Sequence, residues 1–157
     1  MNRIQIPFLC VLALLGAISA NAQTDSTEML AVEKAVMQLF NGMRKGDSTM
    51  VRDAFAENAH LSTTYIDETG NPQVEEGSLI GFLVGVGSPH TETWDERLLS
   101  IEIKIDDGMA QVWTPYVFYF GERRLHCGVN AFQMVKTAKG WKILNLVDTH
   151  RENNCGD

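Results

Sequence analysis

The sequence predicts an α+β domain in which helices come first and an antiparallel sheet follows. On both sides of Gly46 the apolar residues recur at helical spacing, whereas in the second half they alternate along extended segments. Short turn signals separate these segments, as expected for consecutive strands that pair as hairpins. The length of 157 residues suits a single domain preceded by a short leader.

Residues 1–22 are expected to be a secretory signal peptide. One basic residue precedes an apolar run over 6–18, and Ala20-Asn21-Ala22 supplies the small residues of a cleavage site. The run is shorter than the roughly 20 apolar residues needed to span a bilayer, which disfavours the alternative of an uncleaved anchor. We therefore expect an exported protein, periplasmic or secreted, whose single domain covers residues 23–157.

Two helices and a strand are predicted in the first half of the domain. After a polar leader over 24–28, in which Ser26 or Thr27 caps the helix, the first helix runs from Met29 to Gly46. Asp47 or Ser48 caps the second helix. A strand follows over 59–66 and a turn over 70–72.

A short helix and a four-strand meander complete the expected domain. The helix covers 79–86, and its glycines Gly81 and Gly85 would share one face. The first meander strand covers 98–105, with Leu99, Ile101, Ile103 and Ile105 on one side. The remaining strands are expected over 109–120, 125–137 and 141–150, joined by turns over 106–108, 121–123 and 138–140.

The last predicted hairpin fixes how the residues of its two strands pair. Ala138-Lys139-Gly140 suits a three-residue loop that a glycine closes in the left-handed conformation. That loop places Thr137 opposite Trp141, and further along it pairs Met134 with Leu144, Phe132 with Leu146, and Asn130 with Asp148. The shared face is apolar near the turn and polar beyond it, where His126, Asn130, Asp148 and His150 lie. Such a mixed inner face is more typical of a pocket than of a plain core.

Several segments together resemble the nuclear transport factor 2-like superfamily. The first is AVEKAV over 31–36, followed by Gly46-Asp47. Three more, VWTPYVFY over 112–119, HCGVNAF over 126–132, and WKI over 141–143 with VDT over 147–149, are similar to its secreted bacterial branch labelled putative lumazine-binding or SnoaL-like. The resemblance covers about residues 28–151. It implies a cone-shaped, cystatin-like fold in which a strongly curved antiparallel sheet wraps around N-terminal helices and encloses a cavity. It also implies that a homodimer can form through the sheet.

Asp148 and His126 are the catalytic candidates, and each has a structural alternative. Asp148 is either a desolvated general base or, as we prefer, a hydrogen-bonded partner of Asn130 that holds the last strand in register. His126 is either an acid, base or ligand donor, or a half-exposed side chain at the sheet edge.

An aromatic wall for a flat ligand is also expected. Its candidates are Tyr65, Trp94, Tyr116 and Phe118, with ordinary core packing as the alternative. We favour the core role for Phe118 and the cavity role for Tyr116, because a buried hydroxyl needs a partner. Together with His126, Asn130 and Asp148 these four residues form the candidate ligand-binding set.

Cys127 and Cys155 are the two cysteines outside the leader. They could form a disulfide in an exported protein. The interpretation we prefer is that Cys127 is a buried core residue and that Cys155 lies in a loose tail.

The composition excludes some classes of binding partner. Thirteen Lys and Arg stand against 20 Asp and Glu, a net charge of −7, which argues against nucleic acid and against electrostatic docking on an anionic membrane. The four histidines lack metal-ligand spacing, and no dinucleotide or phosphate-binding glycine motif occurs, so neither a metal nor a cofactor is expected. The favoured hypothesis is an exported domain that binds a small, partly apolar molecule. The alternatives are an isomerase or hydro-lyase that uses Asp148 and His126, and a structural or dimerisation module with a dry interior.

Overall fold

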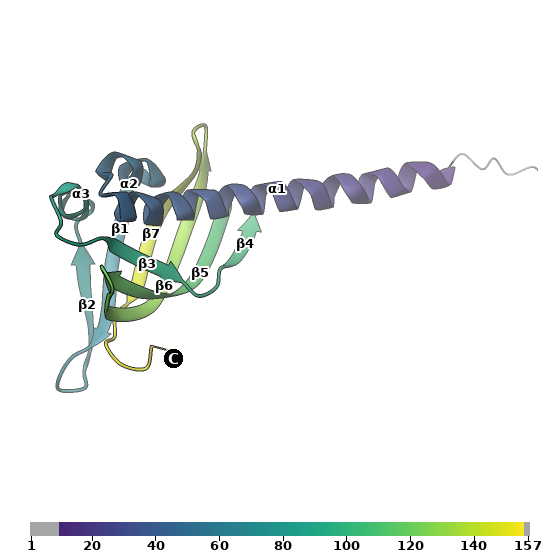
Figure 1. Ribbon diagram of the computed structural model, residues 1–157. Helices are drawn as coiled ribbons and strands as arrows, with labels where there is room; N and C mark the ends of the chain where they lie inside the picture. Colours follow the sequence, from purple (N-terminus) through teal and green to yellow (C-terminus); the bar gives the residue numbers. More distant parts are fainter. Residues whose placement is uncertain (1–9, 156–157) are drawn as a thin grey trace, which may run out of the picture.

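Three helices and a curved sheet make up the described part of the protein. The computed structural model describes residues 10–155, with side chains from Ser26 onward. Helix α1 (Cys10–Lys45) crosses the sheet, and its N-terminal part projects beyond it (Figure 1). Helices α2 (Ser48–Ala54) and α3 (Leu79–Gly87) lie together where α1 ends (Figure 1).

Seven strands form one open, strongly curved sheet in the order β2-β1-β7-β6-β5-β3, with β4 also paired to β5. Neighbouring strands are antiparallel except β1 and β7, which run parallel. The predicted α+β architecture, helices followed by a curved sheet, is thereby confirmed. The strands are β1 (Phe55–Ile66), β2 (Pro72–Gly77), β3 (Trp94–Leu98), β4 (Glu102–Asp106), β5 (Met109–Phe120), β6 (Arg123–Thr137) and β7 (Gly140–Thr149).

The start of α1 differs from the expectation. The helix begins at Cys10 and not after a cap at Ser26 or Thr27. Residues 10–28 contain one glycine, Gly16, and no proline, so no local signal ends the helix within this stretch. The expected cleavage after Ala22 stays a prediction, and the first nine residues of the expected signal peptide lie outside the described residues. No helix in residues 10–155 is both long and apolar enough to cross a membrane.

Local signals correctly placed the end of α1 and the starts of α2 and α3. Gly46 has a φ of 66°, a conformation that favours glycine, and it follows the last residue of α1. The carboxylate of Asp47 accepts the amide of Met50 at 2.9 Å and caps α2, and Ser78 caps α3 in the same way. Of the two glycines expected to share a face of this helix, Gly85 packs on the indole of Trp94, whereas Gly81 lies next to the cap residue Ser78.

The expected strand over 98–105 is in fact two strands. β3 pairs with the second half of β5 and β4 with the first half, and the break lies where the Leu99 amide donates to the Pro115 carbonyl. Proline cannot complete a ladder of hydrogen bonds, so the edge is interrupted beside it. The break shifts the alternation, so Leu98 packs on the core while Leu99 is 58% exposed. Strand β2 was also not expected from the sequence.

The β6–β7 register contains two deviations that cancel. Thr137 lies opposite Gly140 and not opposite Trp141, and Met134 lies opposite Ile143 and not opposite Leu144. A bulge after Ile143 then restores the expected alignment, so Asn130 does lie opposite Asp148, and Phe132 opposite Leu146. The turn-proximal pairs were therefore wrong, and the distal pairs are confirmed.

Cys127 and Cys155 form a disulfide, so the expectation of a loose tail was wrong. The backbone of Arg151 pairs with that of Cys127 through two hydrogen bonds of 2.9 and 3.0 Å, which returns the tail to β6. The disulfide packs with Val117 in a small cluster separate from the main core. The main core lies between α1 and the sheet and includes Val32, Val36, Leu39, Phe40, Phe132, Met134 and Ile143.

Candidate functional site

A cavity of about 570 Å³ lies between the helices and the sheet. Every layer contributes to it: α1, α3, and strands β3, β5, β6 and β7. Most of the lining is aromatic or aliphatic, and the polar groups are few, as is typical of small-molecule sites. The interior is therefore not collapsed. The lining residues are Met43, Phe82, Trp94, Glu96, Tyr116, Phe118, Phe120, Arg123, Leu125, His126 and Asp148.

Asp148 is held by hydroxyl groups from two other strands. Thr63 Oγ1 on β1 donates to Oδ1 at 2.6 Å, and Tyr116 Oη on β5 donates to Oδ2 at 3.0 Å. Thr63 lies directly opposite Asp148 in the parallel β1–β7 pair, which explains the first contact. Each carboxylate oxygen thus has a neutral donor, and the group still faces the cavity.

Tyr116 is buried, and its hydroxyl has two acceptors, Asp148 Oδ2 and the Thr149 carbonyl at 3.1 Å. Burial and the charge of Asp148 raise the pKa of Tyr116, so its hydroxyl stays a donor. Gly128 on β6 lies opposite Tyr116, and its lack of a side chain leaves room for the tyrosine ring. A Cβ at Gly128 would lie 1.7 Å from the Thr149 carbonyl oxygen and 2.9 Å from the tyrosine ring.

Glu96 is the second carboxyl group of the cavity. It lies on β3, and Asn130 Nδ2 donates to its Oε1 at 2.7 Å. Burial, partly offset by this hydrogen bond and reinforced by the charge of Asp148, raises the pKa of Glu96 to about 8. At neutral pH Glu96 is therefore protonated and able to donate a hydrogen bond.

His126 stacks instead of pairing with Asp148. Its ring centroid lies 4.8 Å from that of Phe118 on β5 and 3.9 Å from that of His150 at the end of β7. Burial, with a smaller contribution from His150, lowers the pKa of His126 to about 4. The imidazole is neutral at pH 7, and the predicted His126–Asp148 pair does not form a hydrogen bond in the described structure.

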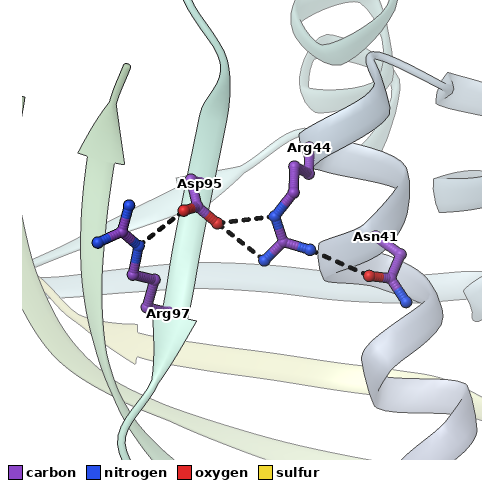
Figure 2. A network of polar contacts seen from close by, with 4 residues as sticks. All are labelled: Asn41, Arg44, Asp95 and Arg97. Carbon is purple, nitrogen blue, oxygen red and sulfur yellow. Dashed lines mark hydrogen bonds and ion pairs between the residues drawn. The ribbon is translucent and has the colours of Figure 1, made fainter. Parts of the chain in front are cut away.

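A polar network outside the cavity fixes strand β3 (Figure 2). Asp95 points away from Glu96, because side chains alternate along a strand. Its carboxylate accepts Arg44 Nε from the last turn of α1 at 2.8 Å and Arg97 Nε at 2.7 Å. Arg44 is also held by Asn41 at 3.0 Å. This clamp joins the edge strand to α1 and holds Trp94 and Glu96 over the cavity.

Most of the candidate residues meet at this cavity. Asn130 does not line the cavity but donates a hydrogen bond to Glu96, which does. The candidates that line the cavity are Trp94, Tyr116, Phe118, His126 and Asp148. Phe118, expected to be core, faces the cavity as well as the core. Tyr65 lies elsewhere: it is on β1 opposite Gln73 of β2, is 38% exposed and does not line the cavity. Ligand binding by these residues stays a prediction.

Glu96 was missed by sequence reasoning. Its signal was present, because Trp94, Glu96 and Leu98 alternate and place one carboxyl group on an apolar face. Assigning the strand to 98–105 hid that pattern. Phe82, Phe120 and Arg123 were also missed, since their approach to the cavity depends on how α3 and the β5–β6 turn pack. No group of three or more His, Cys, Asp or Glu suited to a metal ion occurs among the described residues.

The fold is that of a nuclear transport factor 2-like domain. Helices precede a curved sheet, and a cavity lies between them. The chain belongs to the family described as "Putative lumazine-binding", whose model matches residues 27–147. No curated protein matches the chain.

Solved structures show the same fold at low sequence identity. An NTF2-like protein of unknown function from Shewanella baltica OS155 is 18% identical, with a TM-score of 0.57 over 80% of this chain and 95% of that one. An NTF2-like protein with a cystatin-like fold from Novosphingobium aromaticivorans is 10% identical, with a TM-score of 0.65 over 94% of both chains. A protein from the same organism called a putative scytalone dehydratase is 16% identical, with a TM-score of 0.64 over 83% of this chain and 88% of that one.

Proposed function

We propose that the protein is an exported domain that binds a small, partly apolar molecule in the cavity between helices and sheet. The observation that carries the proposal is the cavity itself: about 570 Å³ with mostly apolar walls and two carboxyl groups that face inward. A volume of this size accommodates a ligand of one or two fused rings. The family description and the aromatic lining together favour a flat, heteroaromatic molecule.

The test is to identify what the cavity holds. Protein purified under non-denaturing conditions is analysed by mass spectrometry for small molecules, and lumazine is titrated while tryptophan fluorescence is followed, since Trp94 lines the cavity. Leu125→Trp fills the cavity from β6 and should abolish binding. Val74→Trp makes a comparable change on the exposed strand β2 and should leave it intact. If no molecule co-purifies and lumazine does not bind, the proposal is wrong.

Proton-transfer catalysis is the second candidate, and one observation favours it. Glu96, protonated at neutral pH, and Asp148, which accepts hydroxyl hydrogen bonds, face the same cavity. Such a pair offers an acid and a base to one bound molecule, as an isomerase or hydro-lyase requires. A bound carbon acid incubated in D₂O would then exchange a C–H for C–D, as measured by NMR. Asp148→Asn should stop that exchange, and exchange at the uncatalysed rate in the unaltered protein would exclude this function.

Export is proposed from the predicted signal peptide and supported by the Cys127–Cys155 disulfide. Disulfides persist in oxidising compartments and are rare in the cytosol. The bond is thus compatible with a periplasmic or secreted protein.

A homodimer through the outer face of the sheet is the proposed assembly. Trp113, Ala131 and Val147 lie side by side on β5, β6 and β7, and Trp113 and Val147 are 51% and 43% exposed. Exposed apolar rows of this kind are typical of interaction sites. Light scattering after size exclusion should give twice the monomer mass, and Trp113→Arg should reduce it to the monomer mass. A monomer at all accessible concentrations would contradict the assembly.

A further inference from the structure

We propose that the ligand of the cavity is an organic cation, an amidine or an alkylammonium group attached to an aromatic ring, whose charged group contacts the carboxyl groups of Glu96 and Asp148. The inference rests on the proposed function, since it names the chemical class of the molecule that the cavity binds. Three features of the site support it: the partners of the two carboxyl groups, the aromatic walls and the position of the other charged groups.

Among the described residues, the hydrogen-bond donors of both carboxyl groups are neutral. Thr63 and Tyr116 donate to Asp148, and Asn130 donates to Glu96. Within the part of the chain that the structure describes, no lysine or arginine forms an ion pair with either group. Two carboxyl groups in one partly apolar cavity are costly without a counter-charge. A cationic ligand supplies that charge.

The walls around the carboxyl groups are aromatic. Trp94, Phe118 and Phe120 line the cavity on the β3–β5 side, and Phe82 covers it from α3. Trp94 and Phe118 meet edge to face, with ring centroids 6.3 Å apart. Aromatic faces attract cations through the ring quadrupole, and aromatic cages are a known way to bind organic ammonium groups. An aromatic ring that carries an amidine or an alkylammonium group satisfies both the apolar walls and the carboxyl groups.

The other charged groups near the cavity do not replace the cation. His126 is neutral at pH 7 because burial lowers its pKa to about 4. Arg123 lines the cavity from the start of β6 but is exposed, so water screens its charge. Arg44 is paired with Asp95 outside the cavity, and Arg151, whose charge acts on Tyr116, is exposed.

In the absence of a cation, a proton on Glu96 compensates one of the two carboxyl charges. Glu96 keeps its proton up to a pH of about 8, so a cation that binds at pH 7 displaces it to solvent. The balance is one cation bound and up to one proton released, with no change in the net charge of the site. Affinity for the cation should therefore rise as the pH increases towards 8 and level off above it, where Glu96 is already ionised.

The experiment compares three probes of one shape and different charge: benzamidine, benzamide and benzoate. Isothermal titration calorimetry at pH 7, in two buffers of different ionisation enthalpy, gives the affinity and the number of protons released. We expect benzamidine to bind at least about tenfold more tightly than benzamide, with benzoate weakest. Proton release should approach one at pH 7 and vanish at pH 9.

Glu96→Gln is the decisive variant, because it keeps the hydrogen bond from Asn130 and removes the titrating group. It should abolish proton release, flatten the pH dependence and reduce the preference for benzamidine by about tenfold. Glu102→Gln, on the exposed face of β4, is the matched control and should behave like the unaltered protein. Were Glu96→Gln not to fold, proton release by the unaltered protein would still decide the question.

The failure of this inference is distinguishable from the failure of the proposed function. If benzamide or lumazine binds as tightly as benzamidine and no proton is released, the ligand is not a cation, although the cavity still binds small molecules. If benzamidine does not bind at all, the inference is equally wrong. The molecules that co-purify with the protein then decide whether the cavity is a binding site.

Discussion

Asp148 supports the fold and faces the cavity at the same time. Its two oxygens accept hydroxyls from Thr63 and Tyr116, so three strands meet at one carboxylate. Burial of a polar group is tolerated when its hydrogen bonds are satisfied, and removing one partner costs more than the bond itself contributed. The structural interpretation of Asp148 therefore applies in part, since the carboxylate joins strands, although its partners are Thr63 and Tyr116 and not Asn130. Its role as a general base stays a prediction.

Asp148→Asn should fold with a free energy of unfolding lower by about 1–3 kcal/mol. The amide keeps one acceptor, but its NH₂ group faces a hydroxyl that must turn to accept. Affinity for lumazine should change little, whereas under the catalytic alternative turnover should fall by roughly 10²–10⁴-fold. Urea denaturation and fluorescence titration of the same sample measure both. Asp106→Asn, at the exposed end of β4, is the control, and equal effects of the two substitutions would contradict a special role for Asp148.

The pKa of Glu96 makes stability depend on pH in a defined window. The folded protein holds the Glu96 proton up to a pH of about 8, whereas the unfolded chain releases it near 4.5. Between these values the folded state binds more protons, so this contribution to stability is complete below about pH 4.5 and is lost as the pH rises to about 8. The loss amounts to a few kcal/mol at most, since a tenfold change in proton affinity is about 1.4 kcal/mol.

Glu96→Gln should remove that loss. Denaturation midpoints of the two proteins are measured from pH 5 to 9. At pH 8 the variant should be the more stable protein, and the difference between the two midpoints should shrink as the pH falls towards 5. Stability differences that stay constant across this range would show that Glu96 titrates normally in the folded protein.

At the scale of the strands, β5, β6 and β7 approach one another closely and together form one wall of the cavity. Gly128 allows the Thr149 carbonyl and the Tyr116 ring to approach β6, and the bulge after Ile143 turns Asp148 to the same side as Tyr116. On the opposite edge, the Asp95 clamp brings β3 to α1 and so places Glu96 over the cavity. Asp148 on the inner strand β7 and Glu96 on the edge strand β3 thereby line the same cavity.

Gly128→Ala should destabilise the protein by about 3 kcal/mol or more, since the new Cβ meets backbone and cannot be relieved by a side-chain rotation. Gly108→Ala is the matched control, because a Cβ there meets nothing within 4 Å and the backbone is not in the left-handed region. Thermal and chemical unfolding of both variants measures the difference. A Gly128→Ala protein as stable as the control would contradict the close packing described here.

The disulfide joins the C-terminal tail to β6. Cys155→Ser should lower the free energy of unfolding by about 3–4 kcal/mol, the loop-entropy value for the 29 residues from Cys127 to Cys155. Dithiothreitol should lower the stability of the unaltered protein to that of the variant and leave the variant unchanged. Insensitivity of the unaltered protein to the reductant would show that the bond does not form in solution.

At the scale of the whole molecule, the sheet curves around α1, and the cavity lies beside the last turn of that helix, where Met43 lines it. Glu28 marks one anchor of the helix: it accepts the indole N–H of Trp141 at 3.0 Å and pairs with Lys136 at 2.8 Å. This contact lies six residues after Ala22, so cleavage there would retain it. The folded domain and the predicted processing site are compatible.

The mature protein should begin at Gln23. N-terminal sequencing of material recovered from the cell envelope or the medium checks this, because the signal peptidase cleaves after a small residue such as Ala22. A chain that still begins at Met1 would contradict both cleavage and the export route that it implies. Substituting Ala20 and Ala22 with a bulky residue should retain the precursor and serves as the control.

The sequence by itself determined the α+β order and the cap of α2, and it predicted the pairing of Asn130 with Asp148. These follow from local periodicity and turn chemistry, which act within a few residues. The same periodicity placed Tyr116, His126 and Asp148 on the inner face. Even the correct distal register depended on a bulge that compensates for a different turn pairing, which no local signal announced.

Only the tertiary structure decided the partners within the site. Glu96 reaches the cavity because β3 pairs with β5 beyond Pro115, and His126 stacks on Phe118 and His150 because three strands bring their rings together. Cys155 meets Cys127 because the tail folds back on β6. Each of these contacts joins distant segments, and its formation depends on sheet curvature and burial, which arise from the packing of the whole chain and not from any short stretch of it.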